Sequence, residues 1–243
     1  MRRLLTGCFV TLLLLLNTLV LFGPLMVFAL LKLLLPGRFR DYASAAVMWI
    51  AETWAEIDKL IFRLCIPTRW DIRGGDDLRR DTSYLVIGNH QSWVDIPALI
   101  QTLNRRTPFF KFFLKKELIW VPFLGLAWWA LDYPFMKRYT KAFLAKNPEL
   151  AGKDLEITKQ ACELYKRQPV TVVYPQQKIP GFWDLISGNV QKVIIDIQTR
   201  ELDPALWQGD YENDPVFREH VQNWVNQLWI EKDRRIKALR AEG

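Results

Sequence analysis

The chain has 243 residues, of which half are apolar and 11 are tryptophan, and its formal net charge is +7 at pH 7. The basic balance favours an anionic partner, which could be a phospholipid head group, a phosphorylated substrate or a nucleic acid. Three single cysteines and two widely separated histidines argue against a disulfide framework and against a zinc site.

The N-terminal part of the chain is an uncharged apolar run over residues 4–31. A spanning helix needs about 20 apolar residues, so this run can cross a membrane, and it is too long for a typical cleaved signal peptide. Asn17 and Pro24 interrupt it, and two arrangements fit: one tilted spanning helix, or a re-entrant pair of helices that bends near Gly23 and Pro24. Basic residues on both sides slightly favour the re-entrant form. We therefore expect a membrane anchor over residues 1–40.

Strand and helix patterns alternate along the rest of the chain. Residues 41–65 carry apolar side chains at three- and four-residue spacing, which is typical of an amphipathic helix. Short apolar runs further on predict strands, and periodic stretches predict helices. The expected strands are 68–74, 83–89, 170–175 and 190–199, and the expected helices are 93–104 after its first turn, 152–168 and 215–240. This alternation predicts an α/β domain over residues 41–243.

His90 is the most suggestive residue of this domain, because it lies between an apolar strand and a helical pattern. α/β folds commonly build their sites at that edge of the sheet. If the intervening residues turn into the helix, the Asp95 carboxylate can fix one ring nitrogen as N–H and leave the other free to accept a proton. The chain has no G-x-S-x-G nucleophile elbow, so such a base would activate a hydroxyl of the substrate. The spacing alone favours a capping or buried hydrogen-bonded pair, but the position directly after a strand and the membrane anchor upstream favour the catalytic interpretation.

The segment "GNHQSWVDIPAL" resembles the first block of the glycerophospholipid acyltransferase family, whose emblem is N-H-x-x-x-x-D. The lysophosphatidic acid acyltransferases are the central members of this family. The next stretch is similar to the second block of the family, in which the matching positions are Lys116, Glu117, Pro122, Gly125 and Arg138. The resemblance covers most of residues 1–170, and its details look most like a bacterial inner-membrane branch.

The resemblance implies a mixed sheet flanked by helices, behind an N-terminal membrane-embedded helical segment. It also implies an acyl transfer from a thioester, carried by coenzyme A or acyl carrier protein, to the hydroxyl of a lysophospholipid such as 1-acylglycerol 3-phosphate. His90 would be the general base and Asp95 its orienting group, while Arg138 would contact the acceptor phosphate and Lys116 would help to bind the substrate. The expected partners are the membrane and these two substrates, with no bound cofactor, metal or nucleic acid. The expected location is the bacterial inner membrane, with the site facing the cytoplasm.

The sequence departs from the family pattern after the strand at 170–173. The family's third block, F-x-E-G-T-R, is absent from the chain, and "VVYPQ" resembles its fourth block instead. We therefore expect the domain to be internally shortened near 173–176, with an incomplete sheet and impaired activity. Lys178, or another basic residue near 166–178, could partly replace the lost phosphate contact. The alternative function is a catalytically impaired or non-enzymatic membrane-associated protein that binds lipids or partners on the same fold.

Overall fold

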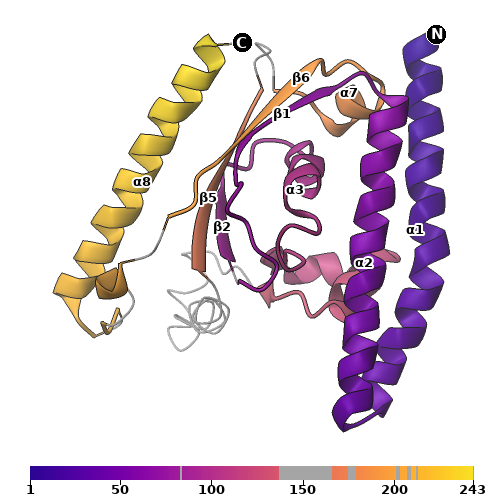
Figure 1. The fold of residues 1–243 in the computed structure, drawn as a ribbon, viewed down its shortest axis with the longest axis horizontal. Coiled ribbons are helices and arrows are strands. Elements are labelled where there is room, and N and C mark those ends of the chain that lie inside the picture. The colour runs from indigo at the N-terminus through magenta and orange to yellow at the C-terminus, as the bar shows by residue number, and fades with distance from the viewer. Residues whose placement is uncertain are drawn as a thin grey trace.

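The structure is a computed structural model, in which a helical hairpin lies beside a small mixed sheet (Figure 1). It describes residues 1–82, 84–136, 166–174, 179–200, 203–206, 209–211 and 213–242.

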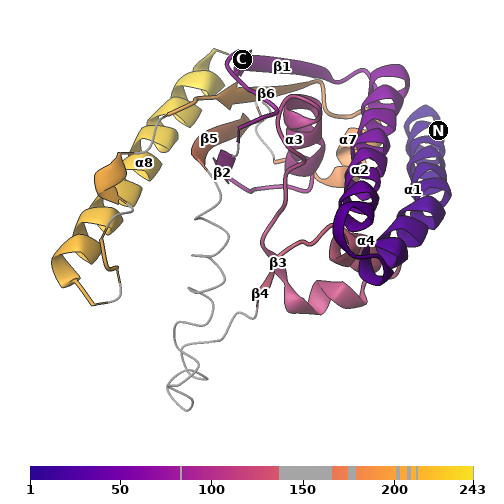
Figure 2. The ribbon, with the colours of Figure 1, turned by 60° about the horizontal axis from the view of Figure 1, so that its bottom comes forward.

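The N-terminal hairpin consists of α1 (Arg2–Leu34) and α2 (Gly37–Cys65), which run side by side (Figures 1 and 2). Of the two predicted arrangements, the slightly favoured pair of helices that bends near Gly23 and Pro24 is wrong, because α1 is one continuous helix through Pro24 and the chain turns only at residues 35–36. Long apolar helices tolerate an internal proline where a neighbouring helix packs against them. Here Leu25, directly after Pro24, belongs to a buried cluster with side chains of α2.

A buried polar contact joins the two helices half-way along α1. Asn17 Nδ2 donates to Asp58 Oδ1 over 2.8 Å and to the Trp54 carbonyl over 3.0 Å. The indole N–H of Trp54 donates a further hydrogen bond to the hydroxyl of Thr18 in α1. Buried polar groups are costly unless they are hydrogen-bonded, so these mutual contacts fix the register of the hairpin.

The outer face of α1 is apolar and open to its surroundings. Exposed side chains along it include Leu5, Leu12, Leu16, Val20, Val27 and Leu34. By length and composition α1 can cross a membrane, and it is the one helix of the described residues that can. The exposure of so large an apolar surface to water is unfavourable, and a surface of this kind is typical of a segment that contacts lipid.

The sheet has the strand order β1-β6-β5-β2 in the described residues. Strands β1 (Arg69–Gly74) and β6 (Lys192–Ile197) pair in parallel, β6 and β5 (Lys166–Val173) are antiparallel, and β5 and β2 (Tyr84–Gly88) are again parallel. The predicted mixed, small sheet is confirmed. The predicted helix 152–168 is wrong at its end, because residues 166–168 pair with β2 as part of β5; residues 152–165 lie outside the described part.

Shorter elements surround the sheet and the hairpin (Figures 1 and 2). Helix α3 lies between the sheet and α2, while α4 packs against α1 and the long helix α8 contacts β5. The predicted helices around 93–104 and 215–240 are therefore confirmed. The bounds of the shorter elements and of α8 are α3 (Asp95–Leu103), β3 (Leu114–Lys115), η1 (Lys116–Trp120), α4 (Leu124–Ala130), β4 (Phe135–Met136), α7 (Phe182–Ile186), η3 (Pro204–Leu206) and α8 (Pro215–Ala241).

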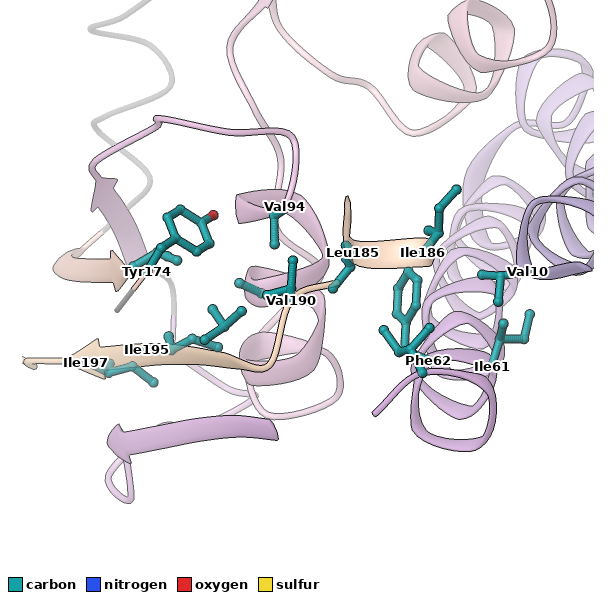
Figure 3. Close-up of a cluster of buried hydrophobic side chains, with 14 residues drawn as sticks. Val10, Ile61, Phe62, Val94, Tyr174, Leu185, Ile186, Val190, Ile195 and Ile197 are labelled. Atoms are coloured by element: carbon teal, nitrogen blue, oxygen red, sulfur yellow. The ribbon is translucent and has the colours of Figure 1, made fainter. Parts of the chain in front are cut away.

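One buried cluster connects the hairpin with the sheet (Figure 3). Phe62 of α2 and Leu185 of α7 meet side chains of β6 in this cluster, and Tyr174, which follows β5, completes it. The indole of Trp183 in α7 lies so close to Gly7 of α1 that a Cβ there would come within 2.8 Å of it. The hairpin is therefore part of the core, and both α7 and α4 pack α1 against the domain.

Candidate active site

The loop between β2 and α3, residues 89–94, carries the candidate site. Asn89 attaches it to the neighbouring strand: its Nδ2 donates to the Val172 carbonyl over 2.7 Å, and its Oδ1 accepts from the Val172 N–H over 2.9 Å. The asparagine side chain thus continues the pairing of β2 with β5 beyond the end of β2 at Gly88. Because β2 and β5 are parallel, their carboxyl ends meet at this edge, where α/β folds place their sites.

His90 and Asp95 are brought together by this loop. Nδ1 of His90 lies 3.0 Å from Oδ2 of Asp95. The His90 side chain is 66% exposed, whereas that of Asp95 is only 4% exposed. The hydrogen bond to the carboxylate assigns Nδ1 the proton, which leaves Nε2 as the nitrogen that can accept one from outside. The pair has the geometry of a base and its orienting group; its catalytic role stays a prediction.

The Asp95 carboxylate also holds the loop in its shape. Oδ2 accepts hydrogen bonds from the backbone N–H of Gln91 over 2.7 Å and of Ser92 over 2.9 Å. Asp95 begins α3, and a negative charge in the first turn of a helix is favourable. The carboxylate that contacts His90 therefore also forms a buried hydrogen-bonded group with the loop, although it makes no capping hydrogen bond to α3 itself.

Tyr174 is the residue of this site that the sequence did not reveal. It directly follows β5, is 1% exposed, and donates a hydrogen bond from its hydroxyl to Oδ1 of Asp95. Burial, and then the adjacent Asp95 carboxylate, raise the pKa of Tyr174 above its usual value, so the hydroxyl keeps its proton. The observation that could have revealed Tyr174 is the parallel pairing of β2 with β5, because it brings the residues just beyond the two strands together.

Ser92 makes a second set of hydrogen bonds that hold the histidine loop in place. The Ser92 hydroxyl donates to the carbonyl of Pro180, and it accepts from the N–H of Val94 over 3.1 Å. Pro180 lies just before α7, so the histidine loop is connected to that helix as well as to β5. Backbone groups of the loop are thereby satisfied without a regular helix or strand.

Of the two predicted substrate-binding residues, Lys116 lies in the described part of the structure and Arg138 does not. Lys116 is exposed at the start of η1, and no hydrogen bond joins it to the histidine loop in the part of the chain that the structure describes. Arg138 and Lys178 lie outside the described residues. Gly125, which matched the second block, allows α4 to approach η1, since a Cβ there would lie 2.0 Å from the Ile119 carbonyl oxygen.

Comparison with known proteins finds one family model and one solved structure that resemble this chain. Residues 69–178 match the model of the Acyltransferase family, a range that includes both His90 and Asp95. The structure is similar to the crystal structure of the 1-acyl-sn-glycerophosphate (LPA) acyltransferase PlsC from Thermotoga maritima, with a TM-score of 0.51 and 19% identity over 94% of this chain and 98% of that chain. No curated protein matches the chain.

The matched range includes the N-H-x-x-x-x-D block, and the similarity to PlsC supports the fold. The match supports the predicted resemblance of this block to the glycerophospholipid acyltransferase family.

Proposed function

We propose that the protein is a membrane-bound O-acyltransferase that moves a fatty acyl group from an acyl thioester to the hydroxyl of a lysophospholipid such as 1-acylglycerol 3-phosphate. The observation that carries this proposal is the exposed His90 ring, held through Nδ1 by the buried Asp95 carboxylate. The match to the acyltransferase model and the structural likeness to a 1-acyl-sn-glycerophosphate acyltransferase support it.

In the proposed reaction the acceptor hydroxyl attacks the carbonyl carbon of the thioester. Nε2 of His90 takes the hydroxyl proton while the new C–O bond forms, and a base of this kind contributes roughly 10²–10⁴-fold to the rate. The C–S bond then breaks, and the imidazolium returns the proton to the sulfur of the departing carrier. Asp95 keeps the ring oriented and stabilises its positive charge in between. The acyl carrier, coenzyme A or acyl carrier protein, is a substrate in this scheme and no bound cofactor is needed.

The apolar face of α1 supports a membrane location for this reaction, because an acceptor with a fatty chain resides in the lipid phase. We propose the bacterial inner membrane, with the site facing the cytoplasm, where acyl thioesters are available. In the proposed binding mode Arg138 contacts the acceptor phosphate, since a guanidinium can bind phosphate oxygens in bidentate fashion, and Lys116 adds a second positive charge.

A catalytically impaired protein that only binds lipid on the same fold is the second candidate. The observation that favours it is the absence of the E-G-T-R block from the sequence, together with the proposed shortening near 173–176. Such a protein would keep the His90–Asp95 contact as a structural remnant. It would bind lysophospholipid without turning it over.

The deciding experiment measures acyl transfer by membranes that contain the protein, supplied with labelled acyl thioester and 1-acylglycerol 3-phosphate. We expect product with the parent protein and with His220→Ala, the matched control at the other histidine, and a loss of at least a hundredfold with His90→Ala. Equal amounts of product from His90→Ala and from the parent protein would exclude His90 as the general base. No product from any of the three, with lysophospholipid still bound, would favour the second candidate.

A further inference from the structure

Asp95 is held from two sides by two different segments of the chain. Its Oδ2 meets the histidine loop, through His90 Nδ1 and the backbone N–H groups of Gln91 and Ser92. Its Oδ1 meets the hydroxyl of Tyr174, which comes from beyond β5. The two oxygens therefore have separate partners, and contacts at both oxygens fix the orientation of the carboxylate.

The position of Tyr174 is itself fixed by the strand that precedes it. Val172, two residues earlier, is tied to the loop by both hydrogen bonds of the Asn89 amide. The ring of Tyr174 is buried in the cluster that joins sheet and hairpin, and it lies beside Val94 in Figure 3. Its hydroxyl consequently has little freedom to leave the carboxylate.

We propose that Tyr174 is a positioning residue, which holds Asp95 by Oδ1 so that Oδ2 stays directed at Nδ1 of His90. This inference rests on the proposed function, in which His90 is the base. The terminal torsion of an aspartate is broad, so a carboxylate that is held at one oxygen alone can turn about its Cβ–Cγ bond and move that oxygen out of line with Nδ1. A donor on the second oxygen removes that freedom.

The hydroxyl of Tyr174 also takes up part of the negative charge of Asp95. In the described part of the structure, the titratable side chains with a recorded contact to this carboxylate are His90 and Tyr174. The remaining donors to it are the backbone N–H groups of Gln91 and Ser92. Removing the hydroxyl leaves more charge facing the ring, which favours the protonated, inactive form of the base.

The test compares Tyr174→Phe with Tyr133→Phe in the full-length protein. Tyr133 is the matched control, because it is a second buried tyrosine whose hydroxyl donates to a carbonyl, that of Phe110, over 3.0 Å. We expect Tyr174→Phe to lower kcat about tenfold with KM for the acceptor unchanged, since one hydrogen bond to a charged group is lost. The acid limb of its pH–rate profile should move to higher pH, and Tyr133→Phe should change neither quantity.

A third variant, Tyr174→3-fluorotyrosine, keeps the hydroxyl and makes it a stronger donor. It should move the acid limb in the opposite direction, to lower pH, and it guards against a phenylalanine variant that fails to fold. A purely structural role would lower activity at every pH by the same factor. Unchanged acid limbs in both Tyr174 variants would overturn the proposal.

A readout without activity separates this proposal from the proposed function. The chain has only two histidines, so ¹⁵N-histidine labelling gives a spectrum of His90 with His220 as internal reference. In the parent protein we expect the two ring nitrogens of His90 to show one dominant tautomer with the proton on Nδ1. Tyr174→Phe should move the two resonances toward each other, whether or not the membranes transfer acyl groups. Identical His90 spectra in both proteins would refute the positioning role even for an active enzyme.

Discussion

Replacing Asp95 by asparagine would change the charge behind His90 while it keeps the hydrogen bonds of the loop. With the amide oxygen in place of Oδ2, the three donors at 2.7, 2.9 and 3.0 Å retain their acceptor. The amide NH₂ then faces Tyr174, whose hydroxyl can turn to accept, so every polar group keeps a partner. Asp95→Asn therefore isolates the electrostatic contribution of the carboxylate.

The size of that contribution follows from the geometry. An imidazolium and a carboxylate whose charges lie about 4 Å apart attract by about 4 kcal/mol at an effective dielectric constant of about 20. The attraction exists only when the ring carries the transferred proton, so its loss raises the barrier and should lower kcat about a thousandfold. Hydrogen bonds to a neutral acceptor are weaker by about 1 kcal/mol each, so the folded state should lose on the order of 3 kcal/mol.

The assay is the initial rate of acyl transfer in vesicles, together with thermal unfolding in detergent. Asp95→Leu is the control for lost structure, since it leaves the buried Ser92 N–H and the Tyr174 hydroxyl without an acceptor, and it should unfold far more readily than Asp95→Asn. An Asp95→Asn enzyme whose kcat stays within threefold of the parent would show that the charge does not assist the base, and the reasoning would fail.

Two further predictions concern stability. Asn17→Leu should lower the free energy of unfolding by about 1–3 kcal/mol in detergent, because it removes the hydrogen bond to the buried Asp58 carboxylate. The double variant Asn17→Asp with Asp58→Asn should re-form this hydrogen bond and recover most of the lost stability. Burial lowers the pKa of Lys232 from its usual 10.5 to about 8, so above pH 8 the unfolded chain binds more protons than the folded one and stability rises with pH. Chemical unfolding at pH 7.5 and 9.5 should show this rise, about 2 kcal/mol, in the parent and not in Lys232→Met; equal slopes for the two proteins would contradict it.

The histidine loop was predictable because its signals are local. An apolar strand, a turn and a helical pattern follow one another within residues 84–103, and they place His90 and Asp95 within reach without knowledge of the rest of the fold. Tyr174 was not predictable in this way, because it lies 79 residues beyond Asp95 and reaches it only through the pairing of β5 with β2. The same pairing explains the error at residues 166–168, where a sheet ladder prevails over a helical pattern.

The bend predicted near Pro24 fails for a related reason. A proline inside a helix removes one hydrogen bond, which predicts a break when the helix is considered alone. Packing of Leu25 and Ala29 against Val47 and Ile50 of α2 stabilises the continuous helix instead. The apolar character of α1 could be read from the sequence, but the position of the turn depends on a partner helix.

The contact of Trp183 with Gly7 connects the hairpin to the loop that carries His90. From Gly7 the chain of contacts passes through α7 to the carbonyl of Pro180, and from there to the Ser92 hydroxyl in the histidine loop. Under the proposed function, a tilt of α1 in the bilayer would therefore reach the loop that carries His90 through these contacts.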